Sequence, residues 1–163
     1  MRAEVVGLAP RRDVLSNGLV VLAKQTTASP AVSVSLTLAA GGVHEPPDRP
    51  GLAHFLSRVL DRGTASRTAD EIADELDSRG VALQTRVTRH VLTVAFDCLS
   101  DDFDDMLALL ADIVREPAFP EDQIELRRVE ILTQVRQDAD SPAVRAVEGL
   151  MELLYGADHP YGR

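Results

Sequence analysis

Tryptophan is absent from this 163-residue sequence, and Cys98 is its only cysteine. A single cysteine excludes an intrachain disulfide and a zinc site built from cysteines. Aromatic residues make up only 4% of the chain, which argues against a platform on which bases or sugars stack. No apolar run is long enough to span a membrane, and residues 1–6 lack the apolar core of a signal peptide. We therefore expect a soluble protein, cytoplasmic by default, with a periplasmic location left open.

Positive charge is also scarce. Lysine and arginine number 17 against 26 aspartates and glutamates, so the formal net charge is -9. Nucleic acids and anionic membranes both select basic surfaces, and we expect neither as a partner. Apolar residues make up 45% of the chain and charged residues 26%. This composition and length are typical of one globular domain with a buried core.

Apolar periodicity and turn residues predict an alternation of strand pairs and helices. Asn17-Gly18 predicts a tight two-residue hairpin turn, because the pair readily adopts positive φ. Thr68 and Glu71 form the spacing of a capping box at a helix start. The patterns predict strands over 19–23, 32–38, 81–87 and 90–99. They predict helices over 51–61, 68–80, 121–139 and 141–154, and a further helix that begins at residue 100 and ends before a linker over 117–120. This order predicts an α+β fold, a two-layer sandwich of a mostly antiparallel sheet with helices on one face.

The predicted helix over 51–61 carries the residues most informative about function. We place one set of side chains on its apolar stripe: Leu52, Phe55, Leu56, Val59 and Leu60. The opposite face then carries His54, Ser57, Arg58 and Asp61. Two histidines four residues apart on such a face can hold one zinc ion, and a neighbouring glutamate can activate its water.

Four segments in order along the chain resemble the pitrilysin/insulinase family of zinc peptidases. They are Asn17-Gly18-Leu19-Val20, Gly51-Leu52-Ala53-His54-Phe55-Leu56, Arg62-Gly63-Thr64 and His159-Pro160-Tyr161-Gly162-Arg163. The resemblance implies an inverted His-x-x-Glu-His motif at residues 54–58. His54 matches the first ligand. Ser57 stands where the family has its general base, and Arg58 stands at the second ligand.

The resemblance also places the third ligand of the family, a glutamate, at Gln134 and a supporting glutamate at Arg127. One imidazole and one neutral amide hold zinc too weakly for a permanent site. We therefore interpret His54, Ser57, Arg58, Arg127 and Gln134 as altered motif positions, and expect no catalytic residue, metal or cofactor. We further expect Arg58 or Arg127 to pair with Asp61 or Glu130 across the former metal position.

The resemblance implies a peptidase-like domain that has lost its metal site and acts as a non-catalytic or structural half of a peptidase assembly. Its partner would be a zinc-bearing homologous subunit or its own second domain, and the pair would enclose a peptide. Residues 1–163 would form one N-terminal domain, incomplete at its C-terminal end, without the second homologous domain. Two alternatives remain: a structural core subunit of a respiratory complex, and a peptidase active through a non-standard site such as Ser57 next to His54.

Overall fold

The computed structural model describes residues 10–26 and 29–162. The chain divides into two units, and the boundary between them in the sequence follows Pro30. Residues 1–6 and Arg163, which the sequence analysis considered, lie outside these ranges. The first unit is an antiparallel hairpin of β1 (Arg11–Val14) and β2 (Val20–Ala23). β1 is not among the predicted strands. The hairpin itself is confirmed.

The hairpin turn differs from the predicted two-residue turn. The N–H of Leu15 donates to the carbonyl of Leu19 at 2.9 Å, which leaves a three-residue loop. Only Gly18 in this loop has a positive φ, 87°. The side chain of Asn17 instead accepts a hydrogen bond from the N–H of Leu19 at 3.1 Å. The Asn-Gly pair therefore acts through one side-chain bond and one left-handed glycine.

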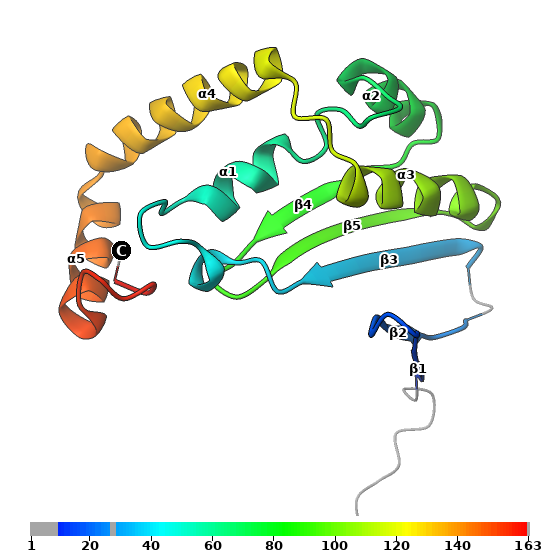
Figure 1. The fold of residues 1–163 in the computed structure, drawn as a ribbon, viewed down its shortest axis with the longest axis horizontal. Coiled ribbons are helices and arrows are strands. Elements are labelled where there is room, and N and C mark those ends of the chain that lie inside the picture. Colours follow the sequence, from blue (N-terminus) through cyan, green and yellow to red (C-terminus); the bar gives the residue numbers. More distant parts are fainter. Residues whose placement is uncertain (1–9, 27–28, 163) are drawn as a thin grey trace, which may run out of the picture. The chain divides into compact units, whose positions relative to one another are not determined.

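Within residues 31–162, the second unit contains one three-stranded sheet and five α-helices (Figure 1). Its elements are β3 (Ala31–Leu38), η1 (Gly42–His44), α1 (Leu52–Val59), α2 (Ala69–Ser78), β4 (Gln84–Val87), β5 (Leu92–Leu99), η2 (Ser100–Asp102), α3 (Phe103–Arg115), α4 (Glu121–Ala139) and α5 (Pro142–Tyr155). The predicted strands 81–87 and 90–99 both begin too early. The second is shortened because Thr88 and Val91 close a turn, with a 2.8 Å bond from the N–H of Thr88 to the carbonyl of Val91.

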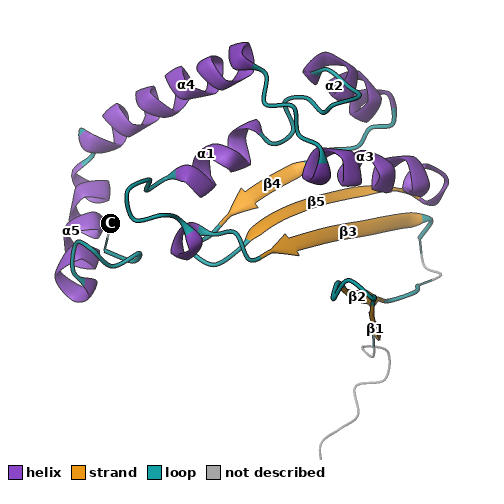
Figure 2. Cartoon of the chain, viewed as in Figure 1, coloured by secondary structure: helices purple, strands orange, loops and turns teal. Residues whose placement is uncertain are grey.

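The sheet has the order β3-β5-β4, with both pairings antiparallel. The central strand β5 alternates, and its buried side chains are Leu92, Val94, Phe96 and Cys98. They join a core to which α1, α2 and α3 contribute, with Leu60, Ile72, Met106, Leu109, Leu110 and Ile113 among its members. On the other face of the sheet the Ser33 hydroxyl donates to Asp97. The predicted α+β sandwich with helices on one face is confirmed (Figure 2).

Cys98 belongs to the hydrophobic core. Burial raises the pKa of the Cys98 thiol, and the nearby carboxylates of Asp102 and Asp97 add to the effect. The thiol is therefore held in its protonated, unreactive form.

None of the helices in the described part of the chain combines the length and the apolar character needed to cross a membrane.

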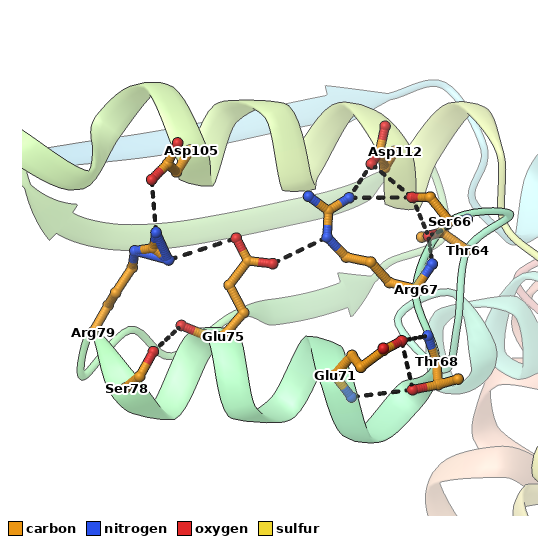
Figure 3. A network of polar contacts seen from close by, with 10 residues as sticks. All are labelled: Thr64, Ser66, Arg67, Thr68, Glu71, Glu75, Ser78, Arg79, Asp105 and Asp112. Atoms are coloured by element: carbon orange, nitrogen blue, oxygen red, sulfur yellow. Dashed lines mark hydrogen bonds and ion pairs between the residues drawn. The ribbon is translucent and has the colours of Figure 1, made fainter.

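A ladder of alternating charges joins α2 to α3 (Figure 3). Arg67, in the loop after α1, pairs with Asp112 of α3 and, at 3.0 Å, with Glu75 of α2. Glu75 also lies 3.5 Å from Arg79, whose guanidinium reaches Asp105 at 2.6 Å. Each arginine thus bridges carboxylates from both helices. The ladder thus fixes Arg67, in the loop between α1 and α2, to both α2 and α3.

The predicted capping box at the start of α2 is confirmed. The Thr68 hydroxyl accepts from the N–H of Glu71 at 3.2 Å, and the Glu71 carboxylate accepts from the N–H of Thr68 at 2.8 Å. The hydrogen bond to the Thr68 backbone, and to a smaller extent the one to the Thr68 hydroxyl, hold the pKa of Glu71 below its ordinary value of 4.5. The charge of Arg67 lowers this pKa further.

We expect Thr68→Ala to lower the free energy of unfolding by about 1 kcal/mol at neutral pH, because α2 loses its N-cap.

For Glu71→Ala we expect a loss of unfolding free energy that depends on pH. The pKa of Glu71 is lower in the folded state, so its stabilisation is present above the unfolded pKa and is lost as the pH falls through the folded one. Urea unfolding at pH 7 and at about pH 3 measures this. A difference between parent and Glu71→Ala that stays constant with pH would contradict the assignment.

Candidate functional site

The start of the motif helix α1 is held by a carboxylate from outside the helix. Glu45 accepts two backbone hydrogen bonds, from the N–H of Gly51 at 3.0 Å and from that of Ala53 at 2.7 Å. An anionic acceptor at this position satisfies free N–H groups and suits the helix dipole. Sequence reasoning missed Glu45. It lies six residues before the N-cap Gly51, which is further than any local capping pattern extends.

The segment before α1 is fixed to the turn between β4 and β5. The N–H of Gly41 donates to the carbonyl of His90 at 3.3 Å, and that of Val43 donates to the carbonyl of Arg89 at 2.8 Å. The backbones approach so closely that a Cβ on Gly41 would lie 2.5 Å from the carbonyl oxygen of Thr88. This contact sets where the chain enters α1 relative to the sheet.

The last sequence motif, of which the structure describes residues 159–162, contacts the same turn. The Tyr161 hydroxyl and Nε2 of His90 share a hydrogen bond of 2.6 Å, and the guanidinium of Arg89 lies 4.7 Å from the centre of the Tyr161 ring. The sequence analysis placed His90 at the start of a strand, but the structure places it in the turn. The segment before α1 and the described part of the last motif thus both contact one short turn.

The buried side of α1 differs from the predicted stripe. Ala53, Ser57 and Val59 are its buried residues, whereas Leu52 is 47% exposed. α1 contacts both β4 and α4, so two sides of a short helix are covered and a single apolar stripe does not describe it. Ser57, predicted on the polar face, is only 8% exposed. Its hydroxyl donates to the carbonyl oxygen of His54 at 2.7 Å, so its proton is not directed at an imidazole.

The facing helix α4 also departs from its predicted stripe, which consisted of Ile124, Ile131, Leu132 and Val135. Ile124 and Ile131 are half-buried, but Leu132 and Val135 are 48% and 56% exposed. The side chain of Arg127 is only 17% exposed and lies among the half-buried positions. The covered side of α4 is therefore mixed, with a charged side chain among its half-buried positions.

That polar contact is centred on Glu130. Its Oε2 lies 2.6 Å from Nη1 of Arg127 on the same helix and 3.9 Å from Nη2 of Arg58 on α1. The contact between the two helices is thus a long ion pair, whereas the hydrogen-bonded pair, Arg127 with Glu130, lies within α4. Asp61, the other predicted carboxylate, lies 3.1 Å from Nε of its neighbour Arg62. The side chain of Arg58 is 52% exposed, so its part of the contact contributes only about 0–1 kcal/mol.

The remaining motif positions make local contacts. Gln134 donates from Nε2 to Asp138 at 2.9 Å along its own helix. His54 is exposed on α1. Within residues 10–26 and 29–162, no three histidine, cysteine, aspartate or glutamate side chains gather in a way that could hold a metal ion. Between α1 and α4 the structure brings the guanidiniums of Arg58 and Arg127 to the Glu130 carboxylate, and it places the guanidinium of Arg128 5.8 Å from the centre of the Phe55 ring.

Comparison with known proteins points to one family. The sequence model of the insulinase family, peptidase family M16, matches residues 20–158. The chain is 33% identical over 150 residues to an uncharacterized zinc protease of Rickettsia bellii, covering 91% of this chain and 36% of that protein. It is 27% identical over 148 residues to the mitochondrial-processing peptidase subunit alpha of Solanum tuberosum, covering 91% of this chain and 29% of that protein.

The fold gives the same result. A crystal structure of a peptidase M16 inactive domain from Pseudomonas fluorescens superposes with a TM-score of 0.89 at 25% sequence identity. The match covers 96% of this chain and 38% of that one. The chain thus spans about a third of the length of the relatives that it matches.

Proposed function

Because this chain belongs to the insulinase family of peptidases, we propose that it is a family domain that has lost its metal site and forms the non-catalytic half of a peptidase assembly. One observation carries the proposal. Arg58, at the position of the second zinc ligand, extends to Glu130 of α4 and shares it with Arg127. This contact, shared by two positions of the altered motif, supports the proposal.

The side chains at the motif positions do not suit zinc. The ion takes three protein ligands in catalytic sites of this kind, and only His54 offers an imidazole. A guanidinium stays protonated in proteins, so Arg58 is a fixed positive charge and has no lone pair for a metal. Arg127 adds a second such charge at the same carboxylate. The residues at these positions therefore do not fit a catalytic zinc ion.

The general base is altered as well. A serine hydroxyl cannot take a proton from water at neutral pH without a partner base. The Ser57 hydroxyl donates to a backbone carbonyl and is nearly buried. This geometry also supplies no activated nucleophile, which argues against a peptidase that acts through Ser57.

The partner is proposed from the kinds of relatives that the chain resembles. The Solanum tuberosum relative is by name one subunit of a peptidase, and the Pseudomonas fluorescens structure is described as an inactive domain. A family domain without catalysis of its own fits either setting. We propose that the partner is a zinc-bearing homologous subunit, or a second homologous domain, and that the two enclose a peptide.

The metal content of the purified chain tests the loss of the site. After equilibration with zinc and dialysis we expect less than about 0.1 zinc per chain, because one imidazole cannot retain the ion. We also expect no cleavage of an unfolded peptide. About one tightly held zinc per chain would overturn the proposal. Cleavage that His54→Ala or Ser57→Ala abolishes would do the same, whereas cleavage that survives both changes indicates a contaminating peptidase.

The partner role needs its own measurement. The chain should co-elute in size-exclusion chromatography with a homologue from the same genome that carries an intact His-x-x-Glu-His motif. Peptide cleavage by that homologue should rise when this chain is added. Separate elution together with unchanged cleavage would remove the assembly from the proposal and leave only the lost metal site.

A further inference from the structure

The chain after α5 folds back onto the end of this helix (Figure 1). The N–H of Gly156 donates to the carbonyl of Glu152 at 2.8 Å, and the N–H of His159 donates to the carbonyl of Gly156 at 3.2 Å. The backbones approach so closely that a Cβ on Gly162 would overlap the carbonyl oxygen of Gly156. We call residues 156–162 the strap. Its backbone is therefore tied to the C-terminal end of α5.

Aromatic rings fix the side chain of Tyr161 within the strap. The ring of Tyr155, the last residue of α5, lies 5.2 Å from that of Tyr161 and stacks on the imidazole of His159 at 5.5 Å, measured between ring centres. The N–H of Tyr161 donates to Nδ1 of His159 at 3.2 Å. Rings at these separations attract one another. The position of the Tyr161 side chain therefore follows that of α5.

The turn between β4 and β5 binds the strap and the segment before α1 through the same two residues. The side chains of His90 and Arg89 contact Tyr161, by a hydrogen bond and a cation–π contact. Their backbone carbonyls accept hydrogen bonds from the N–H groups of Gly41 and Val43. Residues 88–90 are exposed. These contacts, and not burial in the core, therefore bind this end of the turn to its neighbours.

The contacts form a closed ring around the motif helix. α4 contacts both α1 and α5, and the strap and the turn join α5 to the segment before α1. We propose that the strap is a conformational device that couples the position of α5 to the entry of the chain into α1. While Tyr161 holds the turn, the segment before α1 is held as well. Release of Tyr161 loosens both. This coupling goes beyond the proposed function, since it needs neither a partner nor a metal.

A spin label in the segment before α1 tests the coupling on the full 163-residue chain. Asp48 is exposed in this segment, and Asp48→Cys takes the label selectively because Cys98 is buried. Tyr161→Ala should shorten the rotational correlation time of the label roughly twofold, because the turn loses a hydrogen bond and a cation–π contact. Tyr161→Phe keeps the ring over Arg89 and should have a smaller effect in the same direction.

Two controls make this result specific. Leu153→Ala truncates an α5 side chain that is 88% exposed and lies outside the strap, so the label at position 48 should keep the mobility that it has in the parent. A label at Asp74, an exposed position of α2, should not respond to Tyr161→Ala, because α2 lies outside the ring of contacts.

The stability of the chain gives an independent measure of the coupling. Gly41→Ala disturbs the turn from the side of α1, and Tyr161→Ala disturbs it from the side of α5. Gly41 and Tyr161 meet through the turn, so their effects should not be additive. In the Tyr161→Ala background, the factor by which Gly41→Ala raises the unfolding equilibrium constant should be at least roughly threefold smaller than in the parent. In the Leu153→Ala background the factor should equal that in the parent.

Two results would overturn the proposal. Unchanged mobility of the label at position 48 in Tyr161→Ala, with circular dichroism showing an intact fold, means that the strap does not restrain the segment before α1. Additive effects of Gly41→Ala and Tyr161→Ala mean that the strap and this segment hold the turn independently. If either alanine variant does not fold, the label in Tyr161→Phe decides alone. None of these results bears on the lost metal site, which is decided by the zinc content of the chain.

Discussion

The double variant Arg58→His, Gln134→Glu is expected to retain about one zinc per chain after dialysis, whereas the parent chain retains almost none. With His54, the two changes supply two imidazoles and one carboxylate, a ligand set that zinc takes in peptidases. They also remove the guanidinium that now reaches Glu130. Zinc affinity, measured by competition with a chromophoric chelator, should rise at least roughly a hundredfold.

Two further variants make this result specific. Adding Arg127→Gln should raise zinc affinity again, because a fixed positive charge then leaves the neighbourhood of the dication. Adding His54→Ala should abolish binding, because only two ligands remain. Failure of the double variant to bind zinc, with its fold intact, would show that the third ligand position is not at Gln134. The alignment of α4 with the family would then have to be redrawn.

Replacement of Gly41 by alanine is expected to lower the free energy of unfolding by about 2–3 kcal/mol. The added methyl group would lie 2.5 Å from the carbonyl oxygen of Thr88 and equally close to the carbonyl carbon of His90. These are backbone atoms of a turn that is tied to β5 and to Tyr161, so they cannot move aside as a flexible side chain would. Urea unfolding followed by circular dichroism measures the loss.

Gly149→Ala provides the control with the same chemical change. Gly149 lies inside α5, and a Cβ there would meet nothing within 4 Å. Alanine favours a helix interior over glycine by about 1 kcal/mol, so this variant should be slightly more stable than the parent. A Gly41→Ala variant as stable as the parent would show that the segment before α1 separates readily from the turn. Gly41 would then have no part in positioning the motif helix.

Sequence patterns predicted the local structure where all of the contacts involved lie within one short segment. Thr68 and Glu71 form a capping box because both bonds close within three residues. The hairpin around Asn17 and Gly18 is local in the same sense, although the length of its loop was mispredicted. The replacement of two motif residues by Ser57 and Arg58 can be read directly, because these residues lie within the motif itself.

Predictions that depended on which side of a helix is covered were less successful. Leu52 and Ser57 exchanged their expected environments, because α1 is covered by both β4 and α4. Leu132 and Val135 are exposed although they are apolar, since the side of α4 that meets α1 carries Arg127. An amphipathic pattern reports one covered face, and it fails for a helix with two covered faces or a mixed one.

The sequence by itself thus determined the family resemblance, the α+β class and the identity of the residues at the motif positions, since each of these depends on residue types in a linear order. Only the tertiary structure decided what those residues contact. It brought Glu130 of α4 to within 3.9 Å of Arg58 of α1 and placed Glu45 at the start of α1. These contacts join segments far apart in the chain, and their distances follow from how the helices pack on the sheet, which no local pattern encodes.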